Sequence, residues 1–196
     1  MSWSFNKAGN PPNKFPNQFD DDLSCWDTSR VTDMSGMFYA SQNFNGNVEE
    51  WDTSRVRDMS SMFWNAKSFN RRLGKWDVSN VETMENMFEY AYKFAGWGIG
   101  QWDTNKVTNM DYMFYSAYDF NGYVKKWNVS RVTSMYAMFY NATSFAPNNG
   151  QMKHWDTSKV NSMSFMFAGA EQFNDHSIAG WDVSRVEDFD FMFAWA

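Results

Sequence analysis

Carboxylates and cations recur along the chain at a nearly constant interval, and they are the first side chains to test for chemistry. An acidic or amide residue follows a tryptophan in seven places, namely Asp27, Asp52, Asp77, Asp103, Asn128, Asp156 and Asp182. A basic residue stands three positions later in six of the seven, namely Arg30, Arg55, Lys106, Arg131, Lys159 and Arg185. A stacked column of carboxylates could bind a cation such as Ca²⁺, which takes oxygen ligands. We favour a simpler interpretation, in which each Asp-Thr-Ser forms a turn and the basic column neutralises the acidic one.

Few other side chains could support catalysis. His154 and His176 are the only histidines, and both fall in variable segments between repeats with no serine or cysteine nucleophile arranged beside them. Cys25 is the only cysteine, so no internal disulfide can form, and we expect it to pack at a buried edge beside Trp26. The sequence also lacks a glycine-rich phosphate loop and the ligand spacing of a zinc site. These observations predict a protein that is not an enzyme and that holds no cofactor or metal.

One repeated unit must position all of these side chains. Tryptophan recurs at intervals of 25, 25, 26, 25, 28 and 26 residues, at Trp26, Trp51, Trp76, Trp102, Trp127, Trp155 and Trp181. Valine follows five residues after each of them, and Met-Phe follows at eleven and twelve. The pattern predicts a seven-copy repeat over residues 26–196, with an incomplete last copy, preceded by an N-terminal cap with a partial repeat at residues 1–25.

The first repeat shows two periods of apolar residues. From Met37 to Phe44 they fall on one face of a short helix, and Thr28, a β-branched residue just after Trp26, favours a short strand. A strand followed by a helix, repeated, predicts an α/β repeat in which strands of successive coils pair in parallel and the crossover is right-handed. Burying the apolar residues of one coil does not offset the entropy of ordering it, so neighbouring coils must stack.

Composition excludes several functional classes. Aromatic residues make up 20% of the chain and 15 residues are methionine, so we expect a core of rings and methionine. The formal net charge of −6 opposes nonspecific nucleic-acid binding, which needs a basic surface. No apolar stretch is long enough for a transmembrane helix. The opening residues, Met-Ser-Trp-Ser-Phe-Asn-Lys, lack the apolar region of a secretory signal peptide, so the sequence leaves the compartment open.

The repeated phrase Trp-Asp-Thr-Ser-x-Val-Thr-x-Met-x-x-Met-Phe-x-x-Ala-x-x-Phe-Asn, which covers about residues 19–196, resembles the repeat of the BspA-like group. These are leucine-rich-repeat relatives in mycoplasma lipoproteins and other bacterial surface proteins, and also in algae and some of their viruses. The resemblance implies a leucine-rich-repeat-like solenoid, with one short parallel strand and one short helix in each coil of roughly 25 residues. It also implies binding, adhesion or assembly at a surface location, without catalytic residues.

Aromatic residues outside the constant columns form a candidate partner-binding face. They are Tyr39, Trp64, Tyr112, Tyr115, Tyr136, Tyr140, Phe165 and Trp195. These rings could extend the core, or they could bind a partner, because tyrosine and tryptophan combine apolar area with a polar tip. Our first hypothesis is a protein-interaction module or a structural scaffold subunit of a larger assembly, with a protein partner. The alternative is a cell-surface adhesin or carbohydrate-binding module with a glycan ligand.

Overall fold

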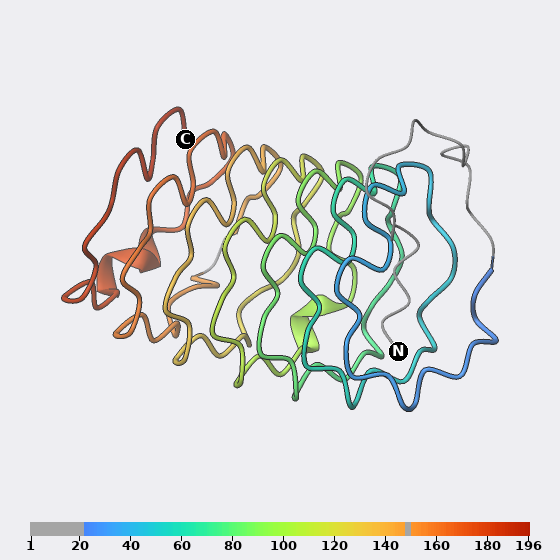
Figure 1. Ribbon diagram of the computed structural model, residues 1–196. Coiled ribbons are helices and arrows are strands. Elements are labelled where there is room, and N and C mark those ends of the chain that lie inside the picture. Colours follow the sequence, from blue (N-terminus) through green and yellow to red (C-terminus); the bar gives the residue numbers. More distant parts are fainter. Residues whose placement is uncertain (1–21, 148–149) are drawn as a thin grey trace, which may run out of the picture.

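Successive repeats form stacked coils. The structure is a computed structural model that describes residues 22–147 and 150–196, and its backbone runs as coils placed side by side from one end to the other (Figure 1). Coils 1 to 7 open at Trp26, Trp51, Trp76, Trp102, Trp127, Trp155 and Trp181. Isolated parallel bridges join corresponding residues of neighbouring coils, in the series Asp33, Asp58, Thr83, Asn109, Ser134, Ser162 and Asp188. The repeat of the sequence is therefore also a repeat of the backbone.

The predicted pairing of a strand with a helix in each coil is wrong. The part of the chain that the structure describes contains neither an α-helix nor a strand, and its regular elements are two short 3₁₀ helices, η1 (Ile99–Gln101) and η2 (His176–Gly180). Each of them ends directly before the tryptophan that opens the next coil. Parallel pairing is present, but it is limited to one bridge between each two neighbouring coils. The expected α/β, leucine-rich-repeat-like solenoid is thus replaced by coils built almost entirely of turns.

Two sets of backbone hydrogen bonds alternate along each coil, and they explain why no helix forms. Four backbone N–H groups of coil 1 donate to carbonyls of coil 2 at 2.7–2.9 Å. The donors are Met34, Gly36, Phe38 and Ala40. The residues between them donate within their own coil, as when the Tyr39 N–H donates to the Gly36 carbonyl at 3.0 Å. An α-helix needs successive residues to donate four positions back. Because every second N–H is bonded to the next coil, that ladder cannot form.

Two positions in every coil hold the backbone in the left-handed region, ten and fourteen residues after the opening tryptophan, with φ of 50–70°. The first column contains Gly36, Ser61, Asn86, Tyr112, Ala137, Phe165 and Phe191. The second contains Ala40, Asn65, Tyr90, Ser116, Asn141, Gly169 and Trp195. A left-handed residue other than glycine costs roughly 1–2 kcal/mol. Each such residue also ends a run of right-handed backbone, which is a second reason why the apolar spacing does not produce a helix.

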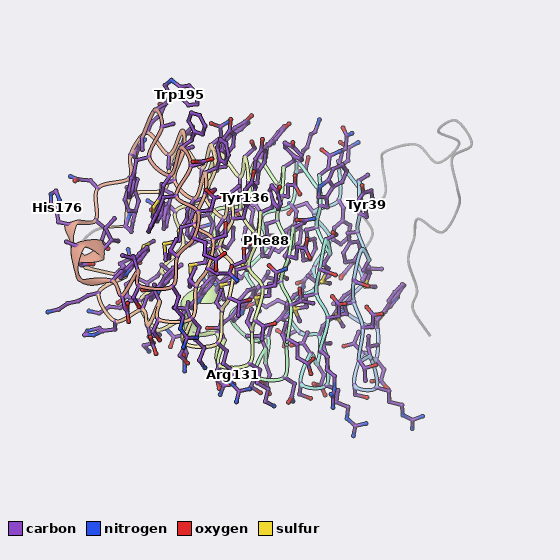
Figure 2. The ribbon with its side chains drawn as sticks, turned by 60° about the vertical axis from the view of Figure 1, so that its left-hand side comes forward. Tyr39, Phe88, Arg131, Tyr136, His176 and Trp195 are labelled. Atoms are coloured by element: carbon purple, nitrogen blue, oxygen red, sulfur yellow. The ribbon has the colours of Figure 1, made fainter. Side chains whose placement is uncertain are left out.

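Phenylalanine forms two columns through the core, as the sequence predicts. In each of coils 1 to 6 two rings stack with centroids 3.7–4.2 Å apart, as Phe88 does on Phe94. Rings of the Phe88 column also stack from coil to coil at 5.4–5.7 Å. Phe88 is fully buried and lies inside the stack (Figure 2). Such ring pairs contribute about 0.5–1.5 kcal/mol each beyond the area they bury, so each coil depends on its neighbours.

The tryptophan column joins the opening of each coil to the residue three positions before the tryptophan of the preceding coil. The Trp51 indole Nε1 donates to the Leu23 carbonyl at 2.9 Å, and the same bond recurs as far as Trp181, which donates to the Met152 carbonyl at 3.1 Å. From coil 2 onward these side chains are at most 9% exposed. A buried donor left without a partner would cost about 1–3 kcal/mol. The indole therefore fixes the distance between the opening segments of two coils.

Two sequence-based expectations concern the N-terminal region. Most of the predicted cap, residues 1–21, lies outside the described residues. Cys25 lies inside them and is exposed, so the expectation that it packs at a buried edge is wrong. Its neighbour Trp26 is itself 41% exposed, and this edge is therefore open to solvent.

Replacing Phe114 with alanine should destabilise the chain by about 3–5 kcal/mol, because the ring packs in a core that cannot close around the cavity. Phe114 stacks on Phe88 in coil 3 and Phe139 in coil 5, so the amides of all three coils should lose protection together in hydrogen exchange. Tyr123→Ala is the control, since its side chain is 46% exposed. Loss of protection confined to coil 4 would contradict the coupling.

Glycine should be tolerated at the left-handed position of coil 5 and not five residues later. Ala137 has φ of 50° and is 1% exposed, whereas Ala142 is fully buried without a positive φ. Alanine to glycine normally costs about 0.5–1 kcal/mol, but at Ala137 it also relieves roughly 1–2 kcal/mol of left-handed strain. We expect Ala142→Gly to lower the free energy of unfolding in urea and Ala137→Gly to leave it nearly unchanged. Equal losses in the two variants would show that the left-handed column carries no strain.

Candidate binding surface

Seven of the eight predicted face residues lie in one continuous row of rings that crosses the coils. We call this row the aromatic stripe; it comprises Tyr39, Trp64, Tyr90, Tyr112, Tyr115, Tyr136, Tyr140, Phe165 and Phe191. From Tyr39 to Phe191 the ring centroids follow one another at 4.3–6.3 Å. Tyr112 and Tyr136 lie 5.1 Å apart beside this row, with Tyr112 5.8 Å from Tyr115. Tyr90 and Phe191, which also stand at variable positions of the repeat, complete the row.

Trp195, the eighth predicted residue, does not join the stripe. Its side chain is 77% exposed, and Figure 2 shows it at the upper edge of coil 7. No ring contact links it to the stripe within residues 22–147 and 150–196. Trp195 therefore stands apart from the stripe as an exposed ring of coil 7, where it takes one of the two left-handed positions of its coil (φ 56°).

The backbone, rather than the rings, sets the spacing of the stripe. The Ala40 N–H donates to the Trp64 carbonyl at 2.7 Å, and the Ser116 N–H donates to the Tyr140 carbonyl at the same distance. Because these bonds hold neighbouring coils in register, a ring at the same place in each coil must meet its counterpart in the next. The stacked pairs Tyr39–Trp64 and Tyr115–Tyr140, at 4.3 and 4.5 Å, are the direct result.

The stripe rings pack on one another while keeping solvent-facing area. Tyr39 is 38% exposed and Phe191 is 62% exposed, whereas Trp64, Tyr115 and the other members are half-buried. The stripe is thus neither part of the sealed core nor a set of isolated surface rings. It forms a continuous, partly apolar surface that is fixed before any ligand arrives.

A carboxylate lies beside the stripe in coil 3, where Tyr90 carries the row of rings onward. Glu89 occupies the place that holds Tyr39, Trp64, Tyr115 and Tyr140 in coils 1, 2, 4 and 5. Two further acids belong to the same part of the stack: the charge of Glu85 acts on Glu89, and that of Asp111 acts on Glu85. Sequence reasoning missed these three residues. For Glu89, the sequence signal is visible only when the repeats are aligned, because a glutamate then stands where coils 1, 2, 4 and 5 have an aromatic residue.

Burial controls the charge state of this acidic group. It raises the pKa of Glu89 to about 7, an effect that the neighbouring Glu85 increases and a hydrogen bond from the Trp64 side chain reduces. Burial also raises the pKa of Glu85, with the charges of Asp111 and Asp58 adding to it. The pKa of Asp111 is raised by burial, against hydrogen bonds donated by the Ser134 hydroxyl and the Tyr136 N–H. Ionising any of these three carboxyls therefore costs free energy, and a cation bound beside them would offset that cost.

Beside the stripe, one ring already binds a cation of the chain. The Lys67 Nζ lies 5.3 Å from the centroid of the Tyr92 ring, which stacks on Tyr118 at 4.8 Å. Tyr92 is also in edge contact with Tyr90 of the stripe, at 6.4 Å. Ammonium groups within about 6 Å of an aromatic face are attracted by its negative quadrupole. The contact shows that rings on this surface are accessible to positive charge.

The acidic column after each tryptophan forms turns, as expected of an Asp-Thr-Ser segment. Asp27 Oδ1 accepts from the Ser29 N–H at 3.1 Å, and Asp182 Oδ1 accepts from the Ser184 N–H at 2.9 Å. The other five members make the same bond two residues on. Hydrogen bonds from Ser29 lower the pKa of Asp27, and the charge of Arg30 adds to them more weakly. The basic column thus acts at a distance, since the two ion pairs among the described residues are Arg57–Glu82 and Lys75–Glu50.

The remaining candidate chemistry is dispersed. His154 and His176 are both exposed, in separate inter-repeat segments. Within the described ranges no three His, Cys, Asp or Glu side chains are grouped so that they could hold a metal ion. Arg131, from the basic column, lies at the lower edge of the coils in Figure 2, away from Trp195 at the upper edge.

Comparison with known families shows which family this repeat belongs to. Residues 1–121 and 95–196 match the family described as "Mycoplasma protein of unknown function, DUF285". The chain belongs to this family. The match agrees with the mycoplasma part of the resemblance seen in the sequence and does not extend to the BspA-like leucine-rich-repeat assignment. Neither a curated protein nor a solved structure matches the chain.

Among the helices of the described residues, none has the length and apolar character needed to cross a bilayer.

Glu89→Gln should stabilise the DUF285 chain at alkaline pH and have little effect in acid. The pKa of Glu89 lies near 7 in the folded chain against an ordinary value of 4.5, so its contribution to stability is complete below about pH 4.5 and is lost as the pH rises through 7. Glutamine removes the cost of ionisation and keeps an oxygen for Trp64. At pH 8 we expect a gain of about 1 kcal/mol in urea unfolding, less than the full pKa shift would give, because the carboxyl is partly solvent-exposed.

The matched control is Glu187→Gln, which removes the same charge from an exposed position in coil 7. A gain of equal size at pH 4 and pH 8 for Glu89→Gln would contradict this account, as would an equal gain in the control.

Proposed function

We propose that this chain is a non-catalytic protein-interaction module, a structural scaffold whose partner lies along the aromatic stripe. The observation that carries the proposal is the continuity of the stripe, whose rings follow one another at 4.3–6.3 Å from coil 1 to coil 7. Protein interfaces are enriched in tyrosine, tryptophan and phenylalanine, and a few such residues dominate their binding energy.

Rigidity supports the proposal. Binding costs free energy when loops and side chains must be ordered, and a surface that is already ordered avoids this cost. The stripe is fixed by bonds such as that from the Tyr90 N–H to the Tyr115 carbonyl at 2.8 Å, and its rings restrict one another by stacking. A partner could therefore dock with little rearrangement of the coils.

A carbohydrate-binding module or adhesin is the second candidate, and a specific observation favours it. Several rings outside the core present exposed faces, among them Tyr118 at 39%, Tyr123 at 46% and Trp97 at 57%. An exposed ring with a polar tip can stack on the apolar face of a sugar. The resemblance to the BspA-like repeat, whose members are surface proteins, also points this way.

The first experiment compares a stripe variant with a control in capture from the native source. The stripe variant is Tyr39→Ala, Tyr115→Ala and Tyr140→Ala combined; alanine suits this column because Ala168 and Ala194 occupy it in coils 6 and 7. The control is Trp97→Ala with Tyr123→Ala, which removes exposed rings away from the stripe. Mass spectrometry identifies captured proteins, and each is then purified for a direct affinity measurement.

We expect the stripe variant to bind the purified partner at least about tenfold more weakly than the control, as loss of interface anchors does. Equal affinities in the two variants would reject the stripe as the binding surface. Binding to an immobilised glycan, lost in either variant while no protein partner is captured, would favour the carbohydrate-binding module. Both variants are first compared with the parent chain in thermal unfolding, so that loss of fold is not read as loss of contact.

A further inference from the structure

An acid stands beside the stripe in coil 3, in the column that holds a ring in coils 1, 2, 4 and 5. On one side the rings of Tyr39 and Trp64 stack at 4.3 Å, and on the other Tyr115 and Tyr140 stack at 4.5 Å. Glu89 lies between the two pairs in the same column. The Asn65 N–H donates to the Glu89 carbonyl at 2.7 Å and the Tyr90 N–H donates to the Tyr115 carbonyl at 2.8 Å, so the backbone holds Glu89 in register between Trp64 and Tyr115. The charge of Glu89 acts on both Tyr112 and Tyr115. A negative group is thus enclosed by aromatic side chains at the centre of the proposed interface.

No cation of the described chain neutralises this group. The charged groups that act on Glu89 and Glu85 are other carboxyls, those of Glu85, Asp111 and Asp58. The two ion pairs in the described ranges, Arg57–Glu82 and Lys75–Glu50, do not include them. Asn109 gives Glu85 a weak neutral contact, with its Nδ2 donating to Oε2 at 3.3 Å. The acidic group is therefore complementary to a positive charge that must come from outside.

The rings around the acid are suited to the same charge. Lys67 above Tyr92, at 5.3 Å, shows a cation held by a ring of this surface, and Tyr92 contacts the stripe through Tyr90. A guanidinium group is planar, stacks on aromatic faces and donates two parallel hydrogen bonds to a carboxylate. An ammonium group has the charge but lacks the planar, two-pronged geometry. The combination of rings and carboxylate thus favours arginine over lysine.

We propose that the partner of the aromatic stripe is a basic protein segment, and that one of its arginine side chains pairs with Glu89 between the Trp64 and Tyr115 rings. This inference rests on the proposed function and adds the chemistry of the partner to it. Charge complementarity carries it, because Glu85, Glu89 and Asp111 supply three carboxyls within an otherwise uncharged row of rings. The net charge of the whole chain, −6, attracts the same kind of segment at longer range.

The test uses the full chain and two synthetic peptides. One is acetyl-Gly-Ser-Arg-Gly-Arg-Ser-Gly-amide, and in the other citrulline, a neutral analogue of the same shape, replaces both arginines. Affinities are measured calorimetrically at low and moderate salt, and the indole N–H resonance of Trp64 reports the place of binding. Glu89→Gln is compared with Glu187→Gln, which changes the net charge by the same amount at an exposed place in coil 7.

We expect the arginine peptide to bind the parent chain and Glu187→Gln alike, and Glu89→Gln about tenfold more weakly, as for a charge-assisted hydrogen bond. The citrulline peptide should not bind, and salt should weaken the arginine complex. Equal affinity of the two variants, or binding of the citrulline peptide, would overturn the inference. A Trp64 shift produced by calcium chloride as readily as by the peptide would also overturn it, in favour of a metal ion.

Failure of the arginine contact can be distinguished from failure of the proposed function. If a purified partner loses affinity for the Tyr39→Ala, Tyr115→Ala and Tyr140→Ala variant but not for Glu89→Gln, the interaction module stands and the arginine contact fails. If neither variant changes its affinity, both proposals fail.

Discussion

The hydrogen bonds between coils are the constraint on which the rest of this structure depends. In coil 1 every second residue from Met34 to Ala40 donates to coil 2, and this alternation requires left-handed backbone twice in each coil. Twelve described residues other than glycine accept that conformation, although each is strained by roughly 1–2 kcal/mol. They can do so because two phenylalanines and a tryptophan are buried in each of coils 2 to 5. Packing therefore overrides local backbone preference, and the coil has no stable form apart from its neighbours.

The sequence predicted the columns well and the backbone poorly, for one physical reason. Buried positions such as Phe63 and Val56 repeat with the period of the coil, so their inward direction can be read without knowing the path between them. The path itself was misread, because apolar residues at intervals of one, four and seven suit a helix and also a series of tight turns. The left-handed positions give little warning, since residues such as Tyr90 and Phe165 rarely adopt positive φ. Tertiary hydrogen bonding decided between two local structures that the pattern alone could not separate.

Part of the candidate surface could likewise be predicted from the sequence, and part could not. Its rings were predictable because they stand at variable positions beside constant ones, and the register of the coils then brings seven of the eight predicted members together. Glu89 was not predictable as a member, because an isolated glutamate in a turn is typical of any soluble surface. Its meaning comes from the coils on either side, which place it beside Trp64 and Tyr115 and partly bury its carboxyl. A residue of this kind is recognised from its column rather than from its own segment.

This division between constant and variable columns has a consequence for how the surface can change. The core phenylalanines, the tryptophan and the hydrogen bonds between coils recur from coil to coil. The position thirteen residues after the opening tryptophan, which supplies four of the stripe rings, instead holds tyrosine, tryptophan, glutamate or alanine. A substitution there, such as Glu89 in place of a ring, alters charge and shape at one step of the stack and leaves the buried contacts of Phe88 untouched. Each coil thus contributes variable contacts to a surface whose spacing is set by the hydrogen bonds between coils. Binding specificity in such a stack can be changed one coil at a time, because the buried phenylalanine stacking and the tryptophan hydrogen bonds that join the coils do not pass through the stripe.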